Sequence, residues 1–280
     1  MRDGHNPNRM ARIQPFGKVI ISAVTHLPNQ EDYHSERFDV IRCSLETMRA
    51  NAGVDCEVLI WDNGSCANLK GWLINNYRPD HLILSRNMGL SIGRASIVHM
   101  LPPDTIVGIA DDDMFYYPGW MAKQIKVLNT FPIVGTVSGW PVRTQFRFHN
   151  KYTLEWGKKC ARLQRGRFIS VQEDKDFCTS IGRDYETEQV QYTRNDKDTL
   201  LTYKKVKAYA TGHHCQFIGK AGTLAPLMRY DSVAMGSDRP FEKAIDDAGL
   251  LRLTTYERTT RHIGNKLDKE LEVLWHEYVT

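Results

Sequence analysis

Short apolar runs rich in β-branched residues alternate, over the first half of the chain, with segments whose apolar residues recur every three or four positions. The first pattern predicts buried strands, and the second predicts helices. We therefore expect strands within 18–24, 56–65, 81–85 and 105–110, and helices at 35–50, 69–77, 92–101 and 120–128. This alternation predicts an α/β fold with a largely parallel central sheet.

The second half of the chain has a weaker pattern. Residues 141–207 are polar, charged and weakly periodic, so we expect loops and irregular structure there. Order returns at 208–228, which predicts a strand, a turn and a further strand or helix. A helix that Gly249 ends before a strand is expected within 240–257, and a C-terminal helix within 266–279.

The ends of the chain and its cysteines bear on where the protein works. Residues 1–17 are polar and contain two prolines, which predicts a flexible tail and not a secretory signal. No apolar run approaches the ~20 residues of a membrane-spanning helix. The six cysteines have neither CxxC pairing nor zinc-ligand spacing, which favours reduced thiols and a cytoplasmic protein.

The formal net charge of +4 is unremarkable, but its distribution is uneven. Within 142–167, eight Lys and Arg residues stand against the single acid Glu155, with four aromatic residues interleaved. A solvated surface segment is the ordinary interpretation of such a run. The alternative is a surface for an anionic partner: a phosphorylated acceptor, a nucleic acid or a membrane face.

Polar side chains follow the predicted strands at the points where they end. Asp111, Asp112 and Asp113 form an unbroken triplet after the apolar run 105–110. Three adjacent carboxylates resist burial, so a Lys or Arg, a helix N-terminus or a metal ion is expected beside them. Thr25 and Asp62 end two other strands. Right-handed crossovers would bring all these ends to one edge of the sheet, where open α/β sheets bind ligands.

The chain has no GxGxxG motif and no Walker loop, which disfavours a dinucleotide dehydrogenase or a P-loop enzyme. Six of its motifs instead resemble, in order, those of GT-A glycosyltransferases, most like glycosyltransferase family 2. They are VIISAVTHLPN, EVLIWDNGS, NMGLSIGRA, IADDDMFYYPGW, GSDRPFEKAIDDAG and HIGN. The resemblance covers roughly 18–140 and 208–265.

The resemblance implies a GT-A fold made of two halves within one domain. A Rossmann-like half at 18–140 would bind the nucleotide sugar, and a half at 208–280 would hold the acceptor and the catalytic base. The segment 141–207 matches no motif of the family and is expected to be a basic insertion, a candidate acceptor surface.

At the triplet, the resemblance implies a divalent cation, Mn²⁺ or Mg²⁺. Asp113 corresponds to the direct metal ligand, and Asp111 to a residue nearer the ribose or a metal-bound water. Asp112 is the middle residue, next to the donor. His262 resembles the family's late histidine, which returns to the metal. A carboxylate-held cation would clamp the donor diphosphate and stabilise it as it leaves.

For the donor, the resemblance implies that Asp62 reads the base, with Thr25 and His26 lining the same pocket. Asp62 could equally stabilise its own Asx turn. Asn87, Gly89 and Arg94 belong to the segment that contacts ribose and diphosphate. Ala95 stands where the family shows an asparagine. Arg94 could also pair with one of the aspartates.

Asp238 corresponds to the family's base, which deprotonates the acceptor hydroxyl, although Ser237 replaces a common glutamate. Asp238 could also serve as an N-cap before Pro240. Asp246 and Asp247 are weaker candidates for the base. His213 and His214 are a competing pair of metal ligands, expected to point to opposite faces of a strand.

The expected function is transfer of a hexosyl or pentosyl group from a UDP- or GDP-sugar to an acceptor hydroxyl, with inversion. Two alternatives stay open: a retaining GT-A enzyme, and a non-catalytic α/β protein that binds nucleotides or nucleic acid. The acceptor could be anionic, either a nucleic acid or a phosphorylated glycolipid.

Overall fold

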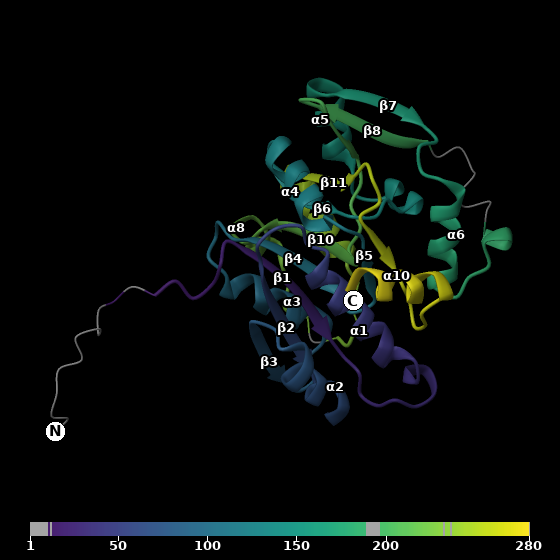
Figure 1. Ribbon diagram of the computed structural model, residues 1–280. Coiled ribbons are helices and arrows are strands. Elements are labelled where there is room, and N and C mark those ends of the chain that lie inside the picture. The colour runs from purple at the N-terminus through teal and green to yellow at the C-terminus, as the bar shows by residue number, and fades with distance from the viewer. Residues whose placement is uncertain (1–10, 12, 189–196, 232, 236, 280) are drawn as a thin grey trace.

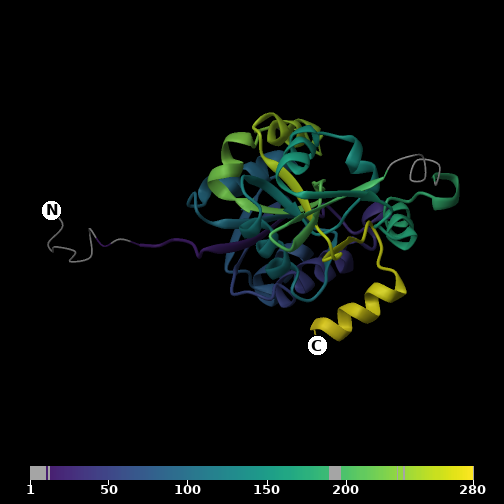
Figure 2. The same ribbon diagram turned by 90° about the horizontal axis from the view of Figure 1, so that it is seen from above.

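The computed structural model describes residues 11, 13–188, 197–231, 233–235 and 237–279 (Figure 1). Most of the expected N-terminal tail, residues 1–10 and 12, therefore lies outside the described residues. Residues 13–15 are exposed and lead away from the sheet in both views (Figures 1 and 2). Contacts with the central sheet begin at Phe16, whose ring lies 4.9 Å from that of His81.

Within the described residues, ten strands form the central sheet in the order β3-β2-β1-β4-β10-β6-β11-β9-β8-β7. The strands are β1 (Val19–Thr25), β2 (Glu57–Asn63), β3 (His81–Ser85), β4 (Ile106–Asp111), β6 (Val134–Ser138), β7 (Arg162–Gly166), β8 (Asp198–Tyr203), β9 (Val206–Tyr209), β10 (Gln216–Lys220) and β11 (Leu251–Thr255). A two-stranded sheet pairs β5 (Met114–Tyr116) with β12 (Thr260–His262).

The sheet is mixed but mostly runs in one direction. The four strands β3, β2, β1 and β4 are mutually parallel, and β6 and β11 are parallel to each other. The reversed strands are β10, β9 and β7, because each is antiparallel to its neighbours. The expected largely parallel sheet is therefore confirmed. Its four adjacent parallel strands all lie before residue 112.

Helices cover both faces of the sheet. They are α1 (Arg37–Ala50), α2 (Ala67–Trp72), α3 (Leu90–Met100), α4 (Trp120–Thr130), α5 (Lys151–Cys160), α6 (Val171–Ser180), α8 (Ala221–Leu224), α9 (Arg239–Asp247) and α10 (Lys269–Val279). A π-helical turn, η2 (Leu73–Tyr77), continues α2, and short 3-10 turns lie at η1 (Asp32–His34), η3 (Arg143–Arg147) and η4 (Ala225–Leu227).

Alternation along the central strands divides the core into two layers. Ile21 of β1 packs with Ile41 and Leu45 of α1 on one face, while its neighbour Ile20 packs with Ile97 of α3 on the other. Because both faces are covered, the strand is a nearly continuous apolar run with no polar side. α10 packs against α1 at the rim of the molecule, through Leu271 and Trp275 (Figure 2).

The prediction that 141–207 is irregular is wrong for the described residues. This segment forms η3, α5, β7, α6 and β8 and the start of β9; residues 189–196 lie outside the described part. Its order depends on distant partners. Trp156 of α5 packs between Phe131 and Tyr203, with ring centroids 6.0 and 5.4 Å away. Because these two partners lie outside the helix, the sequence of α5 alone gives little sign of its buried face.

The sequence analysis also missed β6, which carries small and polar residues yet is buried along its whole length. In the described part of the chain, no helix has the length and apolar character needed to cross a membrane.

Candidate active site

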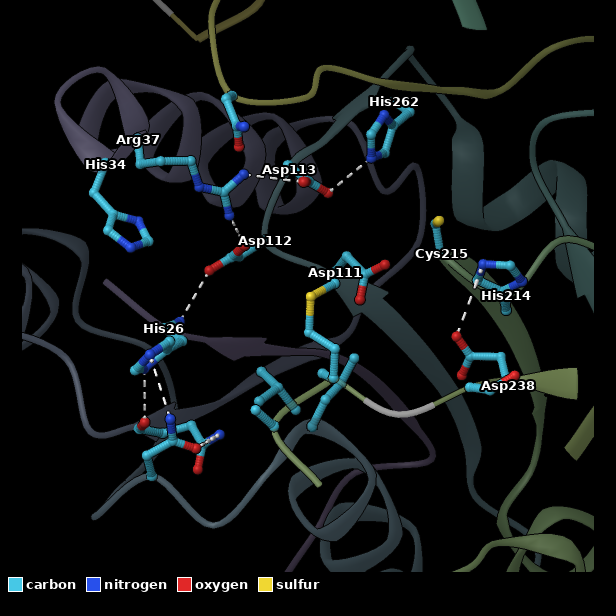
Figure 3. Close-up of a pocket in the computed structure, with 18 of the residues that line it drawn as sticks. His26, His34, Arg37, Asp111, Asp112, Asp113, His214, Cys215, Asp238 and His262 are labelled. Atoms are coloured by element: carbon cyan, nitrogen blue, oxygen red, sulfur yellow. Dashed lines mark hydrogen bonds and ion pairs between the residues drawn. The ribbon is translucent and has the colours of Figure 1, made fainter. Parts of the chain in front are cut away.

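A cleft of about 530 Å³ opens at the carboxyl ends of the parallel strands (Figure 3). Its lining includes Asp111 at the end of β4, Asn63 at the end of β2, His26 just after β1, and Asp238 at the start of α9. The cleft therefore lies at the edge of the sheet where the sequence predicted a ligand site.

Two buried arginines neutralise the aspartate triplet. Arg37, in the first turn of α1, pairs with Asp112 and, at 3.0 Å, with Asp113. Arg94 of α3 pairs with Asp111 and donates from Nη1 to Oδ1 of Asp238 at 2.8 Å. The positive charge that three crowded carboxylates require is thus supplied in part by the protein itself.

The local chain path sets the triplet apart from an exposed acidic loop. β4 ends at Asp111, Asp112 and Asp113 form a tight turn, and β5 begins at Met114. The backbone N–H of His26 donates to Oδ2 of Asp112 at 3.0 Å, which ties the turn to the end of β1. Asp112 and Asp113 therefore share Arg37, while Asp111 pairs with Arg94.

Pairing of β5 with β12 brings His262 to the triplet from the far end of the chain. Met114 lies opposite His262, and the backbone N–H of Ile263 donates to the carbonyl of Asp113 at 2.7 Å. The turn that follows needs glycine: Gly264 has φ +82°, and a Cβ there would lie 2.1 Å from the carbonyl oxygen of Ser180.

One carboxylate oxygen of Asp113 and one ring nitrogen of His262 face each other in the cleft. Nε2 of His262 lies 3.5 Å from Oδ1 of Asp113, while its Nδ1 lies 2.9 Å from the hydroxyl of Ser180. That Oδ1 atom is buried without a hydrogen-bond partner among the described residues. When Nδ1 carries the proton toward Ser180, Nε2 and Oδ1 both offer lone pairs, an arrangement suited to a bound divalent cation.

The charge of Asp113 agrees with that interpretation, whereas His262 must give up its Nε2 proton before it can bind a cation. Burial raises the pKa of Asp113, but His262 and Arg37 outweigh it and hold the pKa well below its usual range. Burial lowers the pKa of His262, but the Asp113 carboxylate outweighs it and raises the pKa above its ordinary value. Asp113 is therefore ionised, as a metal ligand must be.

The candidate donor residues fall into two groups. His26 and Asn87 line the cleft, and both contact Asn63. The backbone carbonyl oxygen of Asn63 lies 3.0 Å from Nδ1 of His26, and the Asn63 side-chain amide donates to Oδ1 of Asn87 at 3.2 Å. Thr25 and Asp62 are fully buried below it, with the Thr25 hydroxyl 3.4 Å from Oδ1 of Asp62.

Asp62 has no surface on the cleft in this arrangement. Its Oδ2 accepts from the backbone N–H of Ser65 at 3.3 Å, as in the Asx-turn alternative. Gly89 precedes α3 with φ +92°, a backbone conformation that favours glycine. Arg94 is buried at the floor and touches the cleft through its two aspartate partners.

Asp238 lies at the N-cap position of α9, but its side chain makes no capping hydrogen bond. Its Oδ1 pairs with Arg94, and its Oδ2 faces Nε2 of His214 at 3.8 Å (Figure 3). Nδ1 of His214 in turn lies 3.1 Å from Oε1 of buried Glu242. Because Glu242 is also paired with Arg239 and Arg252, it is a carboxylate and fixes the orientation of the His214 ring.

Of the competing candidates, His214 lines the cleft, whereas Asp246 and Asp247 do not. Asp246 accepts from the backbone N–H of Tyr152, and Asp247 pairs with Lys243 on the outer surface of α9. The expectation that His213 and His214 point to opposite faces is wrong, since the segment is not a strand and the two rings stack with centroids 4.7 Å apart.

His213 is also poorly arranged to bind a metal with its neighbours. Its Nδ1 accepts from the backbone N–H of Cys215 at 3.2 Å, so in the neutral ring the proton lies on Nε2, which faces the Cys215 sulfur at 4.0 Å.

Two residues of the site, Arg37 and Glu242, were not predicted from the sequence. The triplet indicated that a cation lies beside it, because buried carboxylates require one, but no local pattern identified Arg37 as that cation. Glu242 gave no signal, since only the fold brings it beside His214 and Arg252.

The sequence model described as Glycosyl transferase family 2 matches residues 33–188, more than half of the 280 residues. Comparison with curated protein sequences gives no match.

Two solved structures illustrate the similarity. GalNAc-T7 with UDP, GalNAc and Mn²⁺ is 12% identical over 88% of this chain and 43% of that chain, with a TM-score of 0.46. The mannosyltransferase PcManGT from Pyrobaculum calidifontis, in complex with GDP-Man and Mn²⁺, is 17% identical over 59% of this chain and 47% of that chain, with a TM-score of 0.35. The aligned part is thus less than half the length of either structure. The family match, which extends from η1 through the triplet to α6, shows that this chain belongs to glycosyl transferase family 2.

Proposed function

We propose that the protein is a divalent-cation-dependent glycosyltransferase that moves a sugar from a nucleoside diphosphate sugar to an acceptor hydroxyl. The observation that carries this proposal is the convergence, on one cleft, of the Asp113–His262 pair and Asp238 from three distant segments of the chain. Membership of glycosyl transferase family 2 supports the same reaction class.

Asp113 and His262 would hold the cation, Mn²⁺ or Mg²⁺, with Asp111 beside them. The unpartnered Oδ1 of Asp113 and the ring orientation set by Ser180 support this assignment. When bound, the cation would neutralise charge on the donor diphosphate. Arg94 would reinforce that effect at the floor of the cleft, and His26 and Asn87 would line the donor pocket at its other end.

Asp238 would act as the base. Its Oδ1 is held by Arg94, which leaves Oδ2 to receive a proton. The acceptor oxygen would attack the anomeric carbon, its proton would pass to Oδ2, and the bond from that carbon to the diphosphate oxygen would break. A single displacement of this kind inverts the anomeric configuration, which we propose as the stereochemical outcome. Nε2 of His214 lies 3.8 Å from Oδ2, beyond hydrogen-bond distance, so Oδ2 would stay available to the acceptor hydroxyl.

The two halves of the chain would then divide the work. Residues 18–140 would bind the donor, and residues 208–280 would supply the base and part of the acceptor site. Asn87, Gly89, Thr25 and Asp62 would shape the base and ribose pocket, with Asp62 acting from beneath it.

The test is a screen of UDP- and GDP-sugars for release of nucleotide and transfer to added acceptors, with Mn²⁺ present. Asp238→Asn should lower turnover about 10²–10⁴-fold, the usual contribution of a general base, without weakening nucleotide binding. Asp247→Asn, an equal change on the outer face of the same helix, should leave turnover unchanged.

Near-normal turnover of Asp238→Asn would reject this residue as the base. Nucleotide binding without turnover of any sugar nucleotide would instead favour the non-catalytic alternative. The configuration of the product distinguishes inversion from retention.

A further inference from the structure

A second, smaller cavity of about 240 Å³ lies away from the cleft and shares no lining residue with it. α4, the β8–β9 hairpin and the segment after β11 form its walls. We call it the lysine groove after its four basic lining residues, Lys123, Lys126, Lys205 and Lys207.

The lysine groove is strongly positive. Its one acidic lining residue, Glu257, pairs with Lys123 at 3.0 Å. Lys126, Lys205 and Lys207 have no acidic partner within 4.0 Å among the described residues, and all three are exposed. The groove therefore retains a surplus of positive charge that the protein leaves uncompensated.

The hairpin turn keeps two lysines where the backbone favours other residues. Tyr203 pairs directly with Val206, so Lys204 and Lys205 form a two-residue turn, with φ of +45° and +68°. Such turns favour Asn-Gly, because both positions need left-handed backbone. Lysine at both positions therefore strains the backbone, and backbone strain of this kind is common at functional sites.

The groove also has an aromatic wall. Tyr256 is 42% exposed, and its ring lies 5.8 Å from that of Tyr209 and 4.8 Å from Nζ of Lys207. The exposed ring is thus held in place from two sides. The other large apolar lining residues are Val127, which is buried, and Val206, which is half-buried, so the groove offers little that would insert into a lipid bilayer.

The basic surface continues beyond the groove. Packing of Trp156 against Phe131 and Tyr203 brings the end of α5 to the hairpin, and Arg162 at the start of β7 lies opposite Thr202. α4, α5 and β8 lie together at this end of the molecule (Figure 1). Lys158, Lys159 and Arg162 are exposed there, so part of the basic segment 142–167 extends the same surface.

We propose that the lysine groove binds the phosphate backbone of a nucleic acid. Repeated phosphates match several lysine charges drawn from separate elements, and the held ring of Tyr256 offers a face on which a base can stack. A bilayer surface would share the charge but would call for exposed apolar side chains beside it. The proposal does not depend on glycosyl transfer.

The test is fluorescence anisotropy with short fluorescein-labelled DNA, as a duplex and as a single strand, titrated with the full chain at several salt concentrations. Three lysine contacts predict a log–log salt slope of about −2.7 for the duplex, or about 40-fold weaker binding between about 50 and about 200 mM salt. Lys205→Gln/Lys207→Gln should reduce the slope to about −0.9, or roughly 3- to 4-fold over that range.

Two further variants distinguish an effect of the lysine groove on DNA binding from an effect of net charge and from a loss of folding stability. Lys18→Gln/Lys220→Gln makes the same charge change at exposed positions on the opposite edge of the sheet, and should keep the wild-type slope. Lys204→Asn/Lys205→Gly gives the turn its favoured residues, so it should raise Tm by a few degrees while it weakens DNA binding.

Three results would overturn the proposal: no binding of either DNA at low salt, equal losses in the groove variant and its charge-matched control, or binding to phosphatidylserine vesicles that is tighter than binding to DNA.

Discussion

Arg94 is the residue whose removal should most disturb the cleft without touching Asp113 or His262, the pair proposed to hold the cation. Its side chain is 5% exposed and bridges Asp111 and Asp238. Arg94→Met keeps an unbranched side chain about as long as the aliphatic part of arginine, and it leaves the two carboxylates without their shared guanidinium.

The size of the effect follows from that burial. Removing one partner of a buried ion pair costs about 3–5 kcal/mol, because the remaining charge stays desolvated. At about 2–4 °C per kcal/mol for a large domain, Tm should fall by roughly 6–20 °C. Thermal and urea unfolding at neutral pH measure this. Burial already raises the pKa of Asp111 even though Arg94 opposes it, so lowering the pH should neutralise this carboxylate and shrink the penalty.

A double-mutant cycle checks the cause. Asp238→Asn in the Arg94→Met background should restore part of the lost stability, since one of the two uncompensated charges is gone. If Arg94→Met cost less than about 1 kcal/mol, or if Asp238→Asn made it no better, the bridge would not be a buried ion pair and the reasoning would fail.

Other residues give further predictions. Burial raises the pKa of Glu242, but His214, Arg252 and Arg239 outweigh it and lower the pKa. Glu242 therefore stabilises the fold above its unfolded pKa of about 4.3, and this stability is lost as the pH falls. Glu242→Gln should cost about 3–5 kcal/mol at pH 7 by urea unfolding, and the difference should narrow between about pH 5 and 3; a constant difference would contradict the ionised state. Gly264→Ala should lower Tm well beyond Gly182→Ala, because both glycines have positive φ but only at Gly264 does a Cβ meet backbone, 2.1 Å from Ser180. Equal losses would show that φ strain alone matters.

Much of the first half of the fold could be predicted from sequence. β1 and β4 are nearly continuous apolar runs, and α1 has apolar residues at helical spacing, so each element shows its own pattern locally. The α/β class, the mostly parallel sheet and the family are confirmed. The prediction for 141–207 failed because β7 and β8 are recognised only by their pairing, and α5 only by the aromatic residues it packs against.

The candidate site was partly predictable for the same reason. The sequence shows ionisable residues at or near the ends of predicted elements: Asp111–Asp113, Asp238 and His262. The fold does bring them to one cleft. Their partners are distant in sequence: Arg37 lies 75 residues from Asp112 and 76 from Asp113. Nothing in the local pattern links an arginine in the first turn of α1 to a turn after β4, so only the fold reveals that pairing.

The central claim is that Asp113 and His262 form a cation site that binds a nucleoside diphosphate. Calorimetry with UDP and GDP, with and without Mn²⁺, tests it most directly on the wild-type chain, Asp113→Asn and the control Asp247→Asn. We predict that Mn²⁺ strengthens binding of one nucleotide to the wild type and to the control, and that Asp113→Asn abolishes this gain. Nucleotide binding that does not respond to Mn²⁺ in the wild type, or a gain that persists in Asp113→Asn, would contradict the account.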